Sequence, residues 1–443
     1  MRLRWLPVAL VLGSGLLPLT AFADVPYPAS TGQANPYDYS QYLYAGGPGT
    51  GTQPIDCNAT TTNAPSGFDC NNYKFTSRID PTVEPGVGSP SAQELGGVMG
   101  PSLDKAWDVT TGRPDVHIAV LDSGIMWNQY GDMRDLRNKV VLNWAELPPP
   151  ENALGVSSCA AQIAGGTLPA RTQKLPSPGF PACYDINHDG VFNVEDYAND
   201  PRVNPPNHAY FCCPGSGHTL LTPEDLIEVF TCWDAATDPY GNSLGTLSAA
   251  PGAPATCSNG TYNVDNDGNG FPHDIAGWNF MEHTNDPFDE PNYAHGTGEA
   301  KDSNAEANIG DEIGTCPSCM VLPLKVGDSF IADVNDFAQA VLYATDNQVN
   351  IVQEALGTLN NSSLNQAALD YAYNHGVTVI SSAADEAAGH HNQPASSENH
   401  TIVVNSTRED DLDSQDAGVI PPPLPQPPST GKTYLSLNGC TNY

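Results

Sequence analysis

The sequence predicts an α/β fold in which a parallel β-sheet has helices on both faces. Short apolar runs predict the strands, because a parallel strand covered on both faces is apolar along nearly its whole length. Val116–Leu121 and Met320–Val326 are two such runs. Val334–Asp346, in contrast, carries its apolar residues at helical spacing. Strands and helices that alternate at these lengths indicate a doubly wound parallel sheet.

The remaining elements follow the same alternation. A strand is expected at Val349–Val352, then an amphipathic helix at Leu364–His375 that Gly376 ends as a C-cap. Val377–Ile380 and Thr401–Val404 are further short strands. We expect the sheet to be incomplete at its C-terminal end.

The first 23 residues have the pattern of a secretory signal peptide. Arg2 and Arg4 supply positive charge, Trp5–Leu19 is apolar, and Ala21–Ala23 forms a small-x-small cleavage site. A membrane anchor is the alternative, but the apolar run is short and contains two prolines. We therefore expect an exported protein, secreted or extracytoplasmic, that lacks residues 1–23.

Two regions follow the signal peptide. Residues 24–100 are rich in Tyr, Pro, Gly, Ser and Thr without periodicity, which predicts an N-terminal extension or pro-segment with little regular structure. Residues 101–443 hold the α/β domain, interrupted at about 145–262 by a loop-like insertion. The polyproline stretch at 421–428 predicts a stiff surface loop or a linker.

Eleven cysteines in an exported chain predict several disulfides. Their pairing stays open, and the odd number leaves at least one unpaired, for which Cys440 is the obvious candidate. The insertion holds six of the cysteines and is expected to be stapled by disulfides: Cys159, Cys183, Cys212, Cys213, Cys232 and Cys257. Cys316 and Cys319 have the spacing of a redox motif, but a structural disulfide is expected because they precede a strand in an exported chain.

The charge balance limits the classes of partner. The chain has 16 Lys and Arg against 51 Asp and Glu, a net charge of −35. Nucleic-acid binding needs clustered basic residues, so no nucleic-acid partner is expected. An acidic surface favours solubility and calcium binding. After the signal peptide, no stretch has the length of a membrane span.

Asp122 and His295 have the setting of catalytic groups. Asp122 follows a predicted buried strand, and His295 opens the run His-Gly-Thr-Gly 173 residues later. A serine hydroxyl becomes a nucleophile when an imidazole removes its proton, and that imidazole needs a carboxylate to fix its tautomer. The order aspartate, histidine and then serine is that of the subtilisin type of triad.

Several ordered segments carry a resemblance to the subtilase family, the subtilisin-like secreted serine proteases. The resemblance covers roughly residues 100–410 without the insertion. The segments that match are Ala106-Trp107, Thr111-Gly112, His117–Ile125, Gly277–Phe280, Asn285–Pro287, His295–Thr297, Leu324–Val326, Leu356-Gly357, Gly376–Ile380 and Ala383–Glu386.

The resemblance implies a subtilisin-like sheet and a role for each matching residue. Asp122 would orient the imidazole, and His295 would be general base and acid. Asp385 stands where the family usually has the asparagine that donates to the oxyanion. A protonated Asp385 could still donate, which predicts better activity at acidic pH. Glu299 takes a position that is usually apolar. The insertion explains why the gap from aspartate to histidine exceeds the family's about 32 residues.

No nucleophile segment follows. The family gap from histidine to serine is about 157 residues, which places the serine at about position 452, beyond Tyr443. Four serines near Asp385 match no nucleophile motif, and none is assigned: Ser381, Ser382, Ser396 and Ser397. We expect the chain to be the N-terminal part of a longer protease and to be inactive alone.

Two acidic loops are candidate calcium sites. The first fits the twelve-residue calcium loop, with oxygen ligands expected from Asp185, Asn187, Asp189, the carbonyl of Val191, Asn193 and Asp196. Aspartate replaces the usual glutamate in the last position, as in dockerin-type loops, which is expected to weaken the site. The alternative is an Asp/Asn-rich turn in an acidic protein.

The second loop directly precedes Gly277 and is similar to an acidic loop of many subtilases. Its expected ligands are Asp265, Asp267, Asn269, the carbonyl of Phe271 and Asp274. Both calcium ions would be structural.

The sequence therefore predicts a secreted, calcium-stabilised serine endopeptidase that acts on protein or peptide substrates. The alternative is a pseudoprotease, a secreted calcium-binding or surface-binding protein without catalysis. Asp385, Glu299 and the missing serine favour the alternative. The intact Asp122 and His295 favour the enzyme.

Overall fold

The computed structural model describes residues 110–172, 179–203, 220–248, 256–290, 293–306, 314–329, 332–384, 388–389, 392–396, 400–405, 407–408 and 436–437. The expected signal peptide, the extension 24–100, the polyproline stretch, Cys440 and Asp385 lie outside these residues.

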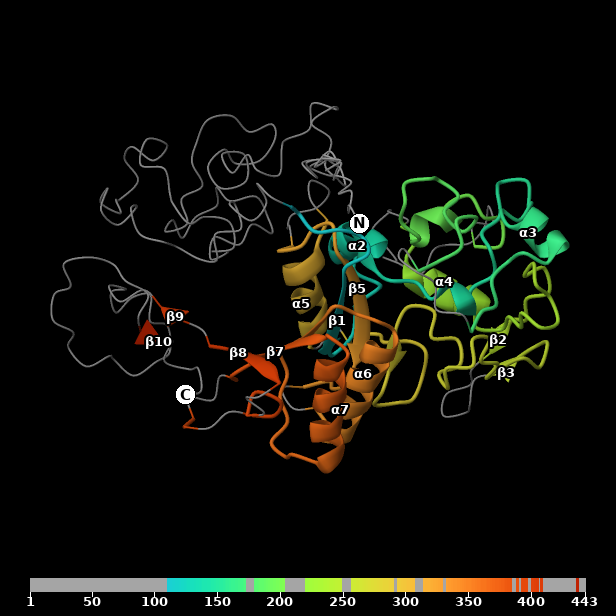
Figure 1. The fold of residues 1–443 in the computed structure, drawn as a ribbon. Helices are drawn as coiled ribbons and strands as arrows, with labels where there is room; N and C mark the ends of the chain where they lie inside the picture. Colours follow the sequence, from blue (N-terminus) through green and yellow to red (C-terminus); the bar gives the residue numbers. More distant parts are fainter. Residues whose placement is uncertain are drawn as a thin grey trace, which may run out of the picture.

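A parallel sheet forms the centre of the molecule (Figure 1). It has six strands in the order β4-β5-β1-β6-β7-β8. The predicted α/β fold is confirmed, and the predicted strands shift by no more than two residues at either end. The short strand β4 was not predicted. The strands are β1 His117–Asp122, β4 Trp278–Asn279, β5 Met320–Lys325, β6 Ile351–Glu354, β7 Thr378–Ser382 and β8 Thr401–Val404.

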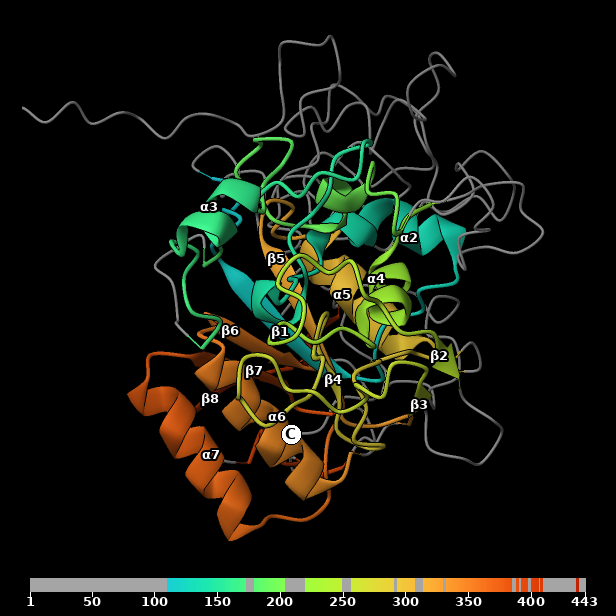
Figure 2. The ribbon, with the colours of Figure 1, turned by 90° about the vertical axis from the view of Figure 1, so that its right-hand side faces the viewer.

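Helices cover both faces of the sheet. Figure 2 shows α6 and α7 on one side, and α2 and α5 on the other. Their bounds are α2 Tyr130–Leu136, α5 His295–Asn304, α6 Val334–Asp346 and α7 Ser363–Asn374. Side-chain caps start the two predicted helices: Asp333 accepts N–H groups at the start of α6, and Ser362 does so at α7. In the described ranges, no helix is long and apolar enough to cross a membrane.

The apolar side chains of β1 pack into two hydrophobic cores. Ile118 and Val120 belong to a buried cluster with residues of α2 and the insertion. Ala119 and Leu121 belong to a second cluster with residues of α6 and α7. Successive side chains of a strand point to opposite faces, so a strand with a core on each side must be apolar throughout. This burial fixes β1, and with it the residue at its carboxyl end.

The insertion lies to one side of the sheet and consists of turns and short elements (Figure 1). Its elements are η4 Trp144–Glu146, α3 Ala160–Gly165, η5 Val194–Tyr197, α4 Pro223–Phe230, β2 Leu247–Ser248 and β3 Thr256–Cys257. Helix α4 was not predicted, although Thr222 and Asp225 form a capping box at its start. The remaining short elements are η3 Arg137–Lys139, β9 Thr407–Arg408 and β10 Ser436–Leu437.

Disulfides close parts of the insertion. Cys159 bonds to Cys183, and Cys232 bonds to Cys257. Cys316 and Cys319 also form a disulfide, in the turn that leads into β5. The Cys316–Cys319 disulfide was expected from the sequence, whereas the two pairings in the insertion were left open.

Candidate active site

Asp122 lies at the carboxyl end of β1, where only 1% of the residue is exposed. The backbone N–H of Ser123 donates to its Oδ1 at 2.7 Å. Carboxyl ends of parallel strands form the edge at which α/β proteins bind ligands. The strand therefore holds this carboxylate at that edge with little freedom to move.

His295 is the first residue of α5 and lies against Asp122. Its Nδ1 is 2.9 Å from Oδ1 and 3.1 Å from Oδ2 of Asp122. The structure thus brings together the two residues that the sequence singled out. The hydrogen bond that His295 donates to Asp122 raises the pKa of His295, while partial burial opposes the increase. The imidazole side chain is 31% exposed, which leaves its outer edge accessible.

Helix α5 can begin this close to β1 because residue 296 is glycine. The Gly296 N–H donates to Ser123 Oγ at 2.8 Å. A Cβ at this position would lie 2.6 Å from the carbonyl oxygen of Gly124. A larger residue would push the helix start away from β1 and separate His295 from Asp122.

Thr297 of α5 forms a hydrogen bond with the segment that follows β1. Its Oγ1 accepts the N–H of Met126 at 2.8 Å and donates to Asp289 Oδ2 at 3.0 Å. The Asp289 N–H donates in turn to the carbonyl of Ile125 at 2.9 Å. Three segments far apart in the sequence therefore fix the helix that carries the imidazole.

The serines near the expected oxyanion position have other partners. Ser381 is buried and donates to Glu354 Oε2 at 2.9 Å. Ser382 Oγ accepts the N–H of Ala384, and Ser396 bonds to Gln393. Ser397 lies outside the described residues. These contacts agree with leaving the nucleophile unassigned among the serines described.

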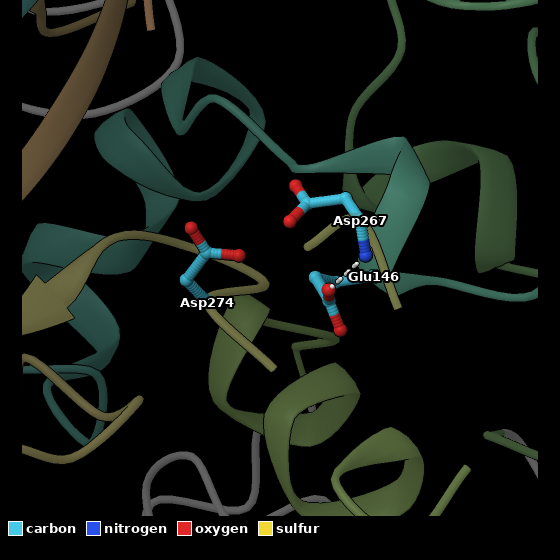
Figure 3. A group of neighbouring side chains, drawn as sticks. All are labelled: Glu146, Asp267 and Asp274. Carbon is cyan, nitrogen blue, oxygen red and sulfur yellow. Dashed lines mark hydrogen bonds between the residues drawn. The ribbon is translucent and has the colours of Figure 1, made fainter. Parts of the chain in front are cut away.

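Three buried or half-buried carboxyl groups meet at the base of the insertion (Figure 3): Glu146, Asp267 and Asp274. One oxygen of each lies within 4.8 Å of the others. Burial, followed by the charge of Asp267, raises the pKa of Glu146 to about 8. Burial also raises the pKa of Asp274 well above its usual value. Ionising this cluster without a cation is therefore unfavourable.

Asn143 bridges the cluster, because its Nδ2 donates to Asp267 at 3.0 Å and to Asp274 at 2.7 Å. Sequence reasoning missed both Asn143 and Glu146. They stand where the insertion begins, and the other two acids follow its end, so no loop spacing connects them. The only local signal was a polar pair, Asn143 and Glu146, amid apolar neighbours.

The predicted second calcium loop is tightly folded. The Asp265 carboxylate accepts the N–H groups of Gly268, Asn269 and Gly270 at 2.7, 3.2 and 2.8 Å. Asn269 Oδ1 accepts the N–H of Phe271 at 2.7 Å. The loop brings Asp267 and Asp274 to Glu146, while Asp265 and Asn269 hold its backbone.

The predicted first loop is folded in a similar way. Asp185 accepts the N–H groups of Asp189 and Gly190, and Asp189 accepts that of Val191. Asn193 caps η5 through the Glu195 N–H, and Asn187 Nδ2 donates to Asp189. Asp196 is buried, and its two oxygens accept the N–H groups of Ile186 and Asn193. Burial raises its pKa to about 7.

Known proteins match parts of this chain. The chain is 31% identical over 131 residues to the thermophilic serine proteinase of Bacillus sp. (strain AK1), and these residues cover 29% of the chain and 32% of that relative. It is 30% identical over 143 residues to thermitase of Thermoactinomyces vulgaris, which covers 32% of the chain and 50% of thermitase. The chain thus spans half or less of the length of these relatives.

Solved structures match over smaller parts. The prenylagaramide maturation protease PagA matches 27% of this chain and 44% of its own at 21% identity and a TM-score of 0.24. The S41 psychrophilic protease matches 26% of this chain and 39% of its own at 28% identity and a TM-score of 0.24. The model of the subtilase family matches residues 113–438, well over half of the sequence. Given that match and the parallel sheet, the chain belongs to the subtilase family.

Proposed function

We propose that this chain is part of a secreted serine endopeptidase in which Asp122 and His295 are two members of the catalytic triad. The observation that carries the proposal is the contact of 2.9 Å between His295 Nδ1 and Asp122 Oδ1. A carboxylate on Nδ1 keeps the proton on that nitrogen and leaves Nε2 as the basic atom. Such a tautomer is what a general base for a serine hydroxyl requires.

In the proposed reaction, His295 Nε2 takes the proton of the serine as the hydroxyl oxygen attacks the peptide carbonyl. It then gives the proton to the leaving amine, and Asp122 stabilises the imidazolium between the two steps. By the family spacing, the serine is expected on a segment that follows residue 443. Protein or peptide chains are the proposed substrates.

Asp385 is proposed to lie at the oxyanion position. A protonated carboxyl group can donate a hydrogen bond there, whereas an ionised one repels the oxyanion. Asp385→Asn in the protease from its native source should therefore raise turnover at neutral pH and reduce any preference for acidic pH. Unchanged turnover and unchanged pH preference would contradict this role.

We also propose a structural calcium ion at the base of the insertion, held by the second loop and by Glu146. Its support is the donor set, since carboxylates, an amide and a backbone carbonyl are the oxygen ligands that calcium prefers. A cation there would offset repulsion among Glu146, Asp267 and Asp274 and link the two ends of the insertion. The loop Asp185–Asp196 is proposed as a second, weaker site.

Removal of calcium tests both sites. Chelation should lower the melting temperature, and calcium should restore it. Glu146→Gln should reduce this difference if the base of the insertion binds the ion, whereas Asp185→Asn tests the weaker loop separately. A melting temperature that does not respond to chelator or calcium would count against both sites.

A pseudoprotease is the second candidate function. The observation that favours it is Glu299, whose carboxylate lies on the Nε2 side of His295, the side that the serine must approach. A pseudoprotease would keep the scaffold and the calcium sites but would lack catalysis.

Fluorophosphonate labelling separates the two functions. The protein secreted by its native source should form a covalent adduct on a serine, and His295→Ala should abolish it. Peptide mapping then identifies the labelled serine. A folded, calcium-treated protein that contains the whole family domain but forms no adduct would refute the protease and support the pseudoprotease.

A further inference from the structure

We propose that Glu299 is a second positioning carboxylate for His295, on the side of the imidazole opposite to Asp122. The proposal rests on the function proposed above, in which His295 is the general base. It concerns a residue that the resemblance alone marks only as a departure from an apolar position.

The geometry places the two carboxylates on different nitrogens. Asp122 Oδ1 is 2.9 Å from Nδ1, and Glu299 Oε1 is 4.0 Å from Nε2. Glu299 follows His295 by four residues in α5, so one turn of helix brings the two side chains to the same face. The imidazole therefore lies between two acidic groups.

Gln353 of β6 orients Glu299. Its Nε2 donates to Glu299 Oε2 at 2.9 Å and to the Glu299 carbonyl at 3.4 Å. One carboxylate oxygen is therefore engaged by the neighbouring strand, and the other faces the imidazole. The side chain of Glu299 is only 26% exposed, which limits screening by water.

The distance of 4.0 Å determines what Glu299 can do. It exceeds the length of a hydrogen bond, so Glu299 does not occupy Nε2 and leaves that nitrogen open to a hydroxyl group. Its charge still stabilises a proton on the imidazole. Glu299 would therefore increase the basicity of Nε2 without blocking it, and would set the pH at which His295 becomes neutral.

Other titratable groups also act on this pair. Asp122 of β1 and Asp289 of the loop before α5 act on His295, and their charges raise its pKa as that of Glu299 does. Asp302 of α5 and Asp122 act on Glu299, and burial is the largest cause of its raised pKa. Glu354 of β6 lies behind them, where burial favours its neutral form. Among the residues that the structure describes, Glu299 is the acidic group within ion-pair distance of Nε2.

The test is the pKa of His295, measured by NMR titration of its imidazole in the 443-residue chain with and without Glu299→Gln. A unit charge at this distance in a partly exposed site changes a pKa by about one unit. Glu299→Gln should lower the pKa of His295 by about that amount, and Glu299→Leu should lower it equally. Glu299→Asp, which retains the charge on a shorter side chain, should give a smaller decrease.

Asp346→Asn is the matched control, because it removes one carboxylate at the end of α6, just before the amino end of β6, whereas His295 contacts the carboxyl end of β1. It should leave the His295 pKa unchanged. Equal shifts in Asp346→Asn and Glu299→Gln would overturn the proposal, since they would reflect total charge. So would a Glu299→Gln variant that lowers the melting temperature without changing the His295 pKa, because that result indicates packing alone.

The labelling reaction gives a second readout. In the full protease, Glu299→Gln should move the acid limb of the fluorophosphonate labelling rate to lower pH by the same amount as the NMR shift. An unmoved acid limb would overturn the proposal. The NMR titration requires no nucleophile, so it can fail while labelling succeeds, or succeed while labelling fails. The failure of this inference is therefore distinguishable from failure of the protease function.

Discussion

Gly296→Ala tests whether close contact between α5 and β1 holds the candidate site together. The Cβ of alanine would lie 2.6 Å from the Gly124 carbonyl oxygen, 2.8 Å from the Gly124 nitrogen and 3.0 Å from the Ser123 nitrogen. All three are backbone atoms, so no side chain can rotate away. The helix start must move, and His295 moves with it.

Gly298→Ala is the matched control in the same helix. A Cβ there meets no atom within 4 Å, and residue 298 is exposed. Alanine in place of glycine within a helix stabilises by about 0.5–1 kcal/mol. At Gly296 this gain is opposed by overpacking against backbone, which costs about 1–3 kcal/mol. The two variants should therefore differ in unfolding free energy by about 1–3 kcal/mol, with Gly296→Ala the less stable.

The unfolding free energies are measured by urea denaturation, and the Asp122–His295 contact by the imidazole NMR signals. Gly296→Ala should lower both the stability of the chain and the pKa of His295, because the hydrogen bond that His295 donates to Asp122 is the main cause of the raised pKa. Gly298→Ala should leave the pKa unchanged and raise the stability. The reasoning is refuted if Gly296→Ala is as stable as Gly298→Ala with the pKa of His295 preserved.

Three further predictions concern individual side chains. Asp122→Asn should lower the pKa of His295. Because this pKa is raised in the folded state, the imidazole stabilises the fold below its unfolded pKa of about 6.5, and this stabilisation disappears as the pH rises through the folded pKa. The free energy of unfolding that Asp122→Asn removes, measured by urea denaturation, should therefore be larger at pH 5 than at pH 9. Ala294 has a φ of 54° at the N-cap of α5, so Ala294→Gly should stabilise the chain by about 1 kcal/mol, and a lower melting temperature would contradict this. The pKa of Glu146 is raised from 4.5 to about 8, so the chelator-treated chain should lose stability as the pH rises between these values, and Glu146→Gln should flatten that dependence in melting experiments.

Local patterns in the sequence were sufficient to predict five of the six strands of the sheet, all but β4. Val334–Asp346 was predicted to the residue because apolar spacing and the Asp333 cap agree, and Thr401–Val404 because a short β-branched run leaves little choice. Asp122 and His295 were found because each lies in a recognisable local setting. Helix α4 was missed because the cysteines and turn residues around it indicated a loop, although Thr222 and Asp225 signal its start.

Contacts across the insertion could not be predicted in the same way. Glu146 meets Asp267, and Gln353 meets Glu299, only after the chain has folded. No periodicity relates residues that are more than fifty positions apart. The sequence could show that Glu299 was unusual, but not that its carboxylate faces Nε2.

The base of the insertion explains how Asp122 and His295 can meet although 173 residues separate them. The backbone N–H of Asn143 donates to the carbonyl of Ile275 at 2.8 Å, and its side chain donates to Asp274. The chain therefore leaves the α/β domain and returns to it at nearly one point. The free energy of closing a loop grows only with the logarithm of its length, so a long insertion costs little more than a short one if its ends are held together. An ion bound by Glu146, Asp267 and Asp274 would hold those ends together. Its loss would first destabilise the segment between β1 and α5 rather than the sheet.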